Sequence, residues 1–236
     1  MSNRAKFGRD AEDFLRQLGF EKGDETDFQY GTYIKSMTAC GGDRTTVRVL
    51  ISNRSGREER EFVIMNAHAE RFALSLGAID EELLCELEYF AEVAKAYGSA
   101  CSSFAFTPSS YSALYKKLLA KGFAKDVSAD AIDCMRDGGF VKEDEIALRR
   151  AQIFVGKRWG KTRIYTKLRE EGFDDSSLGK AHQYLDRVDF AEICAEHIRK
   201  KYGNVPEDDH YRRLMYASIA RMGFSGSEIR EALKLI

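Results

Sequence analysis

The chain has 236 residues, of which 44% are hydrophobic and 32% charged, and its 37 Lys and Arg nearly balance its 38 Asp and Glu. This composition excludes intrinsic disorder, which requires few apolar residues and a high net charge. No apolar run reaches the roughly 18 residues of a membrane-spanning helix, and the start of the chain lacks the apolar core of a signal peptide. We therefore expect a folded, cytoplasmic protein that does not contact a membrane.

The first part of the chain is predicted to hold a small antiparallel sheet. Residues 1–30 are polar with one helical stretch, and we interpret them as a partly helical extension. Three short runs of β-branched or alternating residues follow, separated by Gly41-Gly42 and by residues 53–56, as in an antiparallel meander. The predicted strands are residues 33–39, 45–51 and 60–65.

Two helices are expected to cover this sheet, because so small a sheet is not stable alone. Asn66 can cap a helix that runs to Leu76, and Asp80 can cap a longer helix that runs through Tyr97. A loop is predicted over residues 98–106. The sheet and its covering helices make up a predicted domain of residues 31–106.

From Thr107 onwards the chain repeats itself. Thr107 and Pro108 are suited to be the N-cap and first residue of a helix that Gly122 ends. A Gly-Phe pair closes a helical pattern three times, with the glycines at 122, 172 and 223, a period typical of helical repeats. We predict that each glycine is a left-handed residue after its helix and that the phenylalanine packs back onto that helix.

Each Gly-Phe pair is followed by a second short helix, which Ser128, Ser176 and Ser227 can cap. A third, longer helix is predicted over residues 143–158 and 189–202. The three units are residues 107–158, 159–203 and a truncated 204–236. The predicted fold class is α+β and mainly α: a small antiparallel sheet followed by three tandem three-helix repeats.

No motif in the sequence supports catalysis. Residues 156–162 resemble a phosphate-binding loop, but three residues separate the two glycines where that loop needs four. The four histidines lack metal-ligand spacing, and the five cysteines never form a CxxC pair, so we read the cysteines as reduced, mostly buried thiols. We predict no catalytic residue, no metal site and no cofactor.

One stretch of the sequence is unusually basic. Residues 1–110 carry a net charge of −5 and residues 111–236 one of +4, and between Ala147 and Arg169 there are eight basic residues and no acidic one. Such a stretch lacks the i,i+4 ion pairs of a neutral helix face, so we expect it to bind a polyanion or an acidic protein surface. Trp159 lies within it and could stack on exposed bases. The candidate binding residues are Arg149, Arg150, Lys157, Arg158, Trp159, Lys161, Arg163, Lys167 and Arg169.

The repeat pattern resembles that of the RecX family over about residues 33–236, most strongly in the second and third units. The likeness lies in helix ends such as Lys167-Leu-Arg-Glu-Glu-Gly-Phe173 and in a last unit that reads Arg213-Leu-Met-Tyr-Ala-Ser-Ile-Ala-Arg-Met-Gly-Phe-Ser-Gly-Ser-Glu-Ile-Arg-Glu-Ala-Leu233. The resemblance implies a non-enzymatic regulator that binds the filament of the RecA recombinase on DNA. Such a regulator limits filament extension and thereby damps ATP hydrolysis and strand exchange.

The resemblance implies RecA as the partner and leaves a direct contact with single- or double-stranded DNA open. We expect the protein to act as a monomer. The alternative is a DNA-binding helical module that works without RecA by placing a helix in a groove. The acidic first half of the chain argues against this alternative, because dedicated DNA-binding proteins are usually basic overall.

Overall fold

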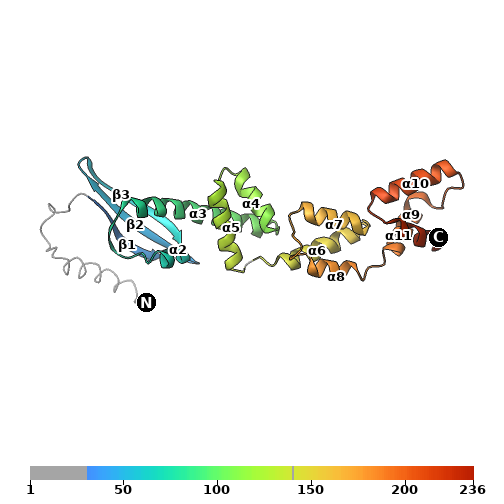
Figure 1. Ribbon diagram of the computed structural model, residues 1–236, viewed down its shortest axis with the longest axis horizontal. Helices are drawn as coiled ribbons and strands as arrows, with labels where there is room; N and C mark the ends of the chain where they lie inside the picture. Colours follow the sequence, from blue (N-terminus) through green and yellow to red (C-terminus); the bar gives the residue numbers. More distant parts are fainter. Residues whose placement is uncertain (1–30, 140) are drawn as a thin grey trace. The chain divides into compact units, whose positions relative to one another are not determined.

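The computed structural model describes residues 31–139 and 141–236, which Figure 1 draws in colour. The chain divides into two compact units, Met1–Gly98 and Ser99–Ile236. The predicted extension over residues 1–30 lies outside the described residues.

The first unit contains a four-stranded antiparallel sheet with the order β3-β2-β1-β4. Its strands are β1 (Gly31–Ala39), β2 (Arg44–Asn53), β3 (Gly56–Met65) and β4 (Gly77–Ile79). The three predicted strands are confirmed. The fourth was missed because a strand of three residues is too short to show an alternating pattern.

Two helices follow β3: α2 (Asn66–Arg71) and α3 (Glu81–Phe106). Asp80 caps α3 as predicted, since its Oδ1 accepts a hydrogen bond from the Leu83 N–H at 2.8 Å. The Asn66 side chain does not cap α2. Its Oδ1 instead accepts a hydrogen bond from the Thr45 hydroxyl on β2 at 2.7 Å, and α2 ends before Leu76.

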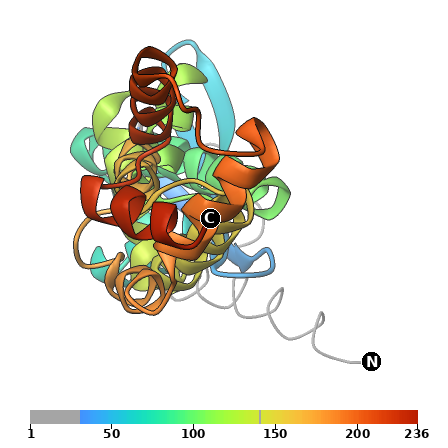
Figure 2. The same ribbon diagram turned by 90° about the vertical axis from the view of Figure 1, so that its right-hand side faces the viewer.

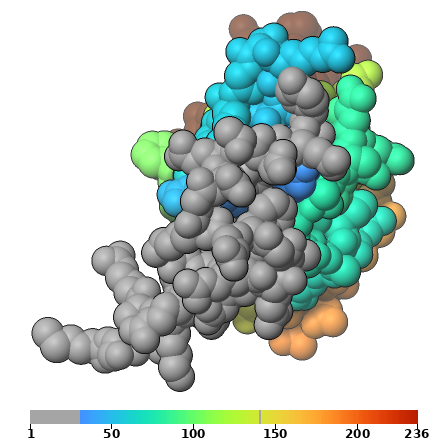
Figure 3. Space-filling view, turned by 90° about the vertical axis from the view of Figure 1, so that its left-hand side faces the viewer, coloured from blue at the N-terminus to red at the C-terminus, as the bar shows by residue number. Residues whose placement is uncertain are grey.

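The core of the first unit lies between the sheet and α3. In Figure 3 the visible parts of the sheet are blue to cyan and α3 is green. Val47, Val49 and Ile64 of the sheet are fully buried against Leu87 and Phe90 of the helix. The loop predicted over residues 98–106 is wrong, because α3 continues to Phe106. Small buried residues continue past Gly98, where Ala100 is 1% exposed, so helical packing does not stop at the glycine.

The second unit consists of the end of α3 and eight further helices among the described residues. These are α4 (Tyr111–Ala120), α5 (Lys125–Asp137), α6 (Glu143–Gly156), α7 (Lys161–Glu170), α8 (Gly179–Leu185), α9 (Phe190–Tyr202), α10 (Asp209–Arg221) and α11 (Gly226–Lys234). Their order follows the predicted three-helix repeat, with α4–α6 in the first unit of the repeat, α7–α9 in the second, and α10 and α11 in the third. The predicted fold class is therefore confirmed.

The helix ends at the Gly-Phe pairs are formed as predicted. Gly122, Gly172 and Gly223 have φ of +93°, +87° and +92°. The Phe173 N–H donates to the Leu168 carbonyl at 3.2 Å, and the Gly172 N–H donates to the Arg169 carbonyl at 2.9 Å, the two bonds of a Schellman motif. A glycine is required here because this backbone conformation strains any residue with a Cβ.

Several predicted helix starts are wrong. Ser110, not Thr107, caps α4 by accepting a hydrogen bond from the Ala113 N–H at 3.1 Å. Ser128 is buried within α5, and Ser225, not Ser227, caps α11. In α5 and α11 the second helix begins about two residues after the Gly-Phe pair, earlier than the serines that the sequence pattern favoured.

Candidate partner-binding surface

The basic residues singled out in the sequence lie on the last helix of the first repeat, on the first helix of the second repeat and on the turn between them. Arg149 and Arg150 lie on α6, and Lys157, Arg158 and Trp159 form the turn that leads to α7. The remaining candidates, Lys161, Arg163, Lys167 and Arg169, lie on α7.

Five of these eight cations have an acidic partner in the folded chain. Arg150 binds Glu171 through both Nε and Nη2, at 2.8 and 2.5 Å, and this hydrogen bonding raises the pKa of Arg150. The other pairs are Arg158 with Glu196 at 3.2 Å, Lys161 with Asp186 at 2.8 Å, Lys167 with Glu170 at 3.1 Å and Arg169 with Asp175 at 2.6 Å. The interpretation of this stretch as free of acidic partners is therefore wrong.

The acidic partners were missed because they lie outside the basic stretch. Glu196 is on α9 and Asp186 follows α8, so the chain must fold before these pairs form. The hydrogen bond from Lys161 lowers the pKa of Asp186. Since both side chains of most pairs are largely exposed, each pair adds little to stability, but it reduces the positive charge available to a partner.

Three cations of the stretch form no ion pair among the residues that the structure describes: Arg149, Lys157 and Arg163. Arg149 is exposed. Lys157 is exposed too, and its Nζ lies 5.7 Å from the ring centroid of Phe154 and 5.8 Å from that of Trp159. These two side chains are the part of the predicted surface that combines exposure with unmatched charge.

Trp159 is packed into the turn between α6 and α7. Its ring stacks on Phe154 with centroids 4.8 Å apart and an interplanar angle of 5°, and the Arg163 guanidinium lies 3.9 Å from its centroid. Arg158 has a φ of +57°, which turns the chain so that the Trp159 N–H donates to the Phe154 carbonyl at 3.2 Å. The indole has a structural role here, and its stacking on a nucleic-acid base stays a prediction.

The second and third repeats meet backbone to backbone beside this turn. The Gly160 N–H donates to the Met222 carbonyl at 2.9 Å, and the Thr162 N–H donates to the Gly223 carbonyl at 3.2 Å. A Cβ placed on Gly160 would lie 2.2 Å from the carbonyl carbon of Gly223. This approach leaves no room for a side chain, so Gly160 is required by the joint and not by a phosphate.

An equivalent joint links the first and second repeats. The Ser110 hydroxyl donates to the Glu171 carbonyl at 2.6 Å, and a Cβ on Gly172 would lie 2.8 Å from the Ser110 Oγ. In both joints the start of one repeat's first helix receives the Gly-Phe helix end of the next repeat. The signal for this in the sequence is that Ser110 and Gly160, two small residues, are separated by the repeat period.

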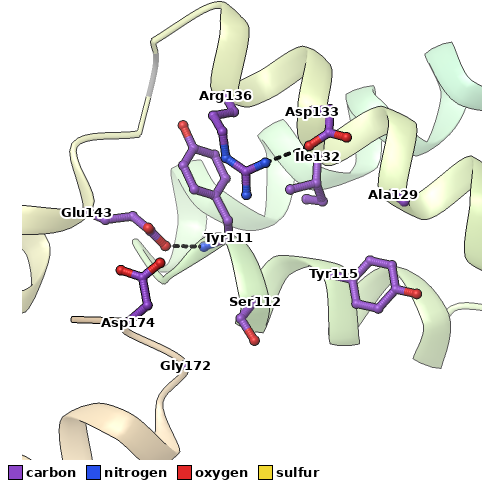
Figure 4. Close-up of a pocket in the computed structure, with 10 residues that line it drawn as sticks. All are labelled: Tyr111, Ser112, Tyr115, Ala129, Ile132, Asp133, Arg136, Glu143, Gly172 and Asp174. Atoms are coloured by element: carbon purple, nitrogen blue, oxygen red, sulfur yellow. Dashed lines mark hydrogen bonds and ion pairs between the residues drawn. The ribbon is translucent and has the colours of Figure 1, made fainter. Parts of the chain in front are cut away.

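A cavity of about 430 Å³ lies at the joint between the first and second repeats (Figure 4). Glu143 and Asp174 lie on one side of it, and the Glu143 Oε1 accepts a hydrogen bond from the Tyr111 N–H at 2.6 Å. Burial raises the pKa of Glu143, and the charge of Asp174 raises it further. On the other side Arg136 pairs with Asp133 at 2.6 Å.

The five cysteines are free thiols that differ in their exposure. All five cysteines are free, but Cys194 is the one fully buried thiol and Cys40 and Cys85 are exposed, so the prediction of mostly buried thiols is wrong. Burial raises the pKa of the Cys194 thiol to about 11, which makes it a poor nucleophile. Within residues 31–139 and 141–236, no three His, Cys, Asp or Glu side chains gather as metal ligands. No helix among these residues is long and apolar enough to cross a membrane.

Fold and surface together define a tandem helical-repeat protein with an antiparallel sheet ahead of the repeats. No family model matches the chain. It is 30% identical over 122 residues to the regulatory protein RecX of Xanthomonas axonopodis pv. citri (strain 306), a match that covers 51% of this chain and 75% of that protein. The RecX protein of Chromobacterium violaceum is 26% identical over 120 residues, with 51% and 76% covered.

Two solved structures have a similar fold. One, described as a regulatory protein RecX, aligns with a TM-score of 0.65 and 18% identity over 87% of this chain and 100% of its own. The other, RecX from Lactobacillus salivarius, aligns with a TM-score of 0.51 and 18% identity over 61% and 98%. The chain belongs to the RecX family of regulatory proteins, as its sequence pattern predicted.

Proposed function

We propose that this protein binds the RecA filament on DNA and limits its extension, and that it thereby reduces ATP hydrolysis and strand exchange. The observation that carries this proposal is the relationship to the RecX regulatory proteins. The action is binding, not catalysis, and it would take place in the cytoplasm, on filaments assembled on DNA.

The repeat architecture supports the proposal. The joint between the first and second repeats and the joint between the second and third repeats use the same contact. In each, the Gly-Phe helix end of one repeat lies on the start of the preceding repeat's first helix. Side chains at equivalent positions therefore recur along the array, which suits a partner that is itself a polymer of repeated protomers. Several weak contacts made at once can then give useful affinity.

Within the predicted surface, we assign the main electrostatic contact to Arg149 and Lys157. Both are exposed and neither forms an ion pair among the described residues. The five paired cations contribute less, because an acidic side chain already matches each of them. Arg163 is held against Trp159 and Met222 and is less free to move towards a partner.

The test replaces both free cations in one variant, Arg149→Glu with Lys157→Glu. RecA-dependent ATP hydrolysis on single-stranded DNA is measured against increasing protein. We expect the concentration that halves hydrolysis to rise about tenfold or more, because two charge reversals at an interface weaken association strongly. The matched control, Lys116→Glu with Lys125→Glu, makes the same change at two exposed lysines of the first repeat and should inhibit like the unmodified protein.

Unchanged inhibition by the first variant would remove Arg149 and Lys157 from the mechanism. Equal loss in both variants would show that overall charge matters and not this surface.

A second titration, against bare DNA, tests the alternative function. Affinity for bare DNA equal to that for RecA–DNA filaments, with a steep dependence on salt, would favour a DNA-binding module that acts without RecA.

A further inference from the structure

The first helix of the third repeat, α10, has an outward face that the function proposed above does not use. Tyr211 and Leu214 lie one turn apart on it and are 62% and 52% exposed. Arg221 follows Leu214 by two turns on the same side, and Arg213 flanks the row. Figure 2 shows α10 and α11, in red, facing the viewer.

This face corresponds to the joint surface of the other repeats. Tyr211 stands one repeat period after Gly160, as Gly160 does after Ser110. Ser110 and Gly160 are both buried under the helix end of the next repeat. Ser110 and Gly160 are the N-caps of α4 and α7, whereas Tyr211 lies inside α10, whose N-cap is Asp208, and its side chain is 62% exposed.

Where the other two repeats have a small buried residue at this spacing, α10 therefore has a large exposed side chain. The outward face of α10 carries two large exposed side chains, Tyr211 and Leu214. Adjacent exposed apolar side chains of this kind favour a surface that binds a partner.

The charge of the face defines the partner further. Arg213 and Arg221 are exposed and form no ion pair among the described residues. The acidic residues at the start of α10 are already used, because Asp208 caps the helix and Asp209 pairs with Arg212 at 3.1 Å. The face therefore combines an apolar centre with unmatched positive charge.

We propose that the outward face of α10, formed by Tyr211, Arg213, Leu214 and Arg221, binds a protein surface in which carboxylates surround an apolar recess. Tyr and Arg are, together with Trp, the residues most enriched at the energetic centres of protein interfaces. A nucleic-acid backbone would use the two arginines but would gain nothing from burying an exposed leucine. This inference rests on the proposed function and places the acidic surface on the RecA protomers of the filament.

The test uses the full-length protein and compares two affinities for each variant. Binding to RecA filaments assembled on single-stranded DNA and binding to the same DNA alone are measured by sedimentation. Tyr211→Ala with Leu214→Ala should weaken filament binding about tenfold or more and leave DNA binding unchanged. Arg213→Glu with Arg221→Glu should weaken filament binding too. Leu235→Ala with Arg230→Glu, an exposed apolar and an exposed basic residue outside α10, is the control and should bind like the unmodified protein.

The outcomes separate this inference from the function on which it rests. Filament binding by the unmodified protein, with no loss in the Tyr211 and Leu214 variant, would overturn the α10 proposal alone. An equal loss of affinity for bare DNA would overturn it in favour of a nucleic-acid contact. No filament binding by the unmodified protein would overturn both proposals. Circular dichroism of each variant checks that the exposed substitutions leave the helices intact.

Discussion

The Glu143 carboxylate occupies a position where its surroundings oppose ionisation. It sits at the cavity between the first and second repeats, where burial and the charge of Asp174 raise its pKa, although the Tyr111 N–H and Arg136 act in the opposite direction. A carboxyl group whose pKa is higher in the folded protein than in the unfolded chain binds more protons in the folded state between the two pKa values. Stability therefore falls as the pH rises through that window.

Glu143→Gln tests this effect. The amide oxygen of Gln can still accept the Tyr111 N–H, but it carries no charge. As the pH rises from about 4.5, the usual value for Glu, the unmodified protein should lose free energy of unfolding relative to the variant. The difference should become constant above the raised pKa. Urea unfolding at several pH values measures it, and parallel stability curves for the two proteins would contradict the assignment.

At the scale of single elements, the sequence predicted the helix ends better than the helix starts. Glycine at a left-handed position is a local requirement, so Gly122, Gly172 and Gly223 could be recognised from the sequence alone. Serine is less specific, because several serines near a helix start can serve as the cap. Which one does so depends on where tertiary packing begins the helix.

The start of α11 allows this distinction to be measured. The Ser225 Oγ accepts from the Glu228 N–H at 3.2 Å, and the Glu228 carboxylate accepts from the Ser225 N–H at 2.6 Å, which completes a capping box. Ser225→Ala should lower the free energy of unfolding by about 1 kcal/mol. Ser227→Ala, at the residue favoured by the sequence pattern, should change it by about 0.5 kcal/mol or less. Urea unfolding of both variants decides between the two caps, and the reverse order would contradict the structure.

At the scale of the whole molecule, the repeat period predicted the fold, but it did not predict how the charges are matched. The spacing of the Gly-Phe pairs is visible in the sequence because every repeat must end its first helix in the same way. The partners of Arg158 and Lys161 are Glu196 on α9 and Asp186 just after α8, and the sequence does not show that these residues lie beside the basic stretch. The sequence also does not show that one face of α10 is exposed. This face becomes evident only by comparison with the starts of α4 and α7, each of which is covered by the Gly-Phe helix end of the next repeat.

Among the described residues, the hydrophobic core of the sheet and the core of the second and third repeats share no residue, so we expect a defect in one to leave the other intact. Ile34, Val47 and Phe62 belong to the core of the first unit, whereas the core around Ile164 and Ile219 lies wholly in the second. A defect at the joint between the second and third repeats should therefore spread along the repeats and leave the sheet unaffected. Gly160→Ala creates such a defect, because its Cβ would collide with the Gly223 backbone.

We expect Gly160→Ala to lower the free energy of unfolding of the second unit by about 1–3 kcal/mol, the usual cost of overpacking. Trp159, the single tryptophan of the chain, reports this transition by fluorescence. Hydrogen exchange of the β2 and β3 amides should be unchanged. Gly156→Ala is the matched control, since nothing lies within 4 Å of its added Cβ, and it should be neutral or slightly stabilising. Loss of protection in the sheet of Gly160→Ala would show that the two units unfold together.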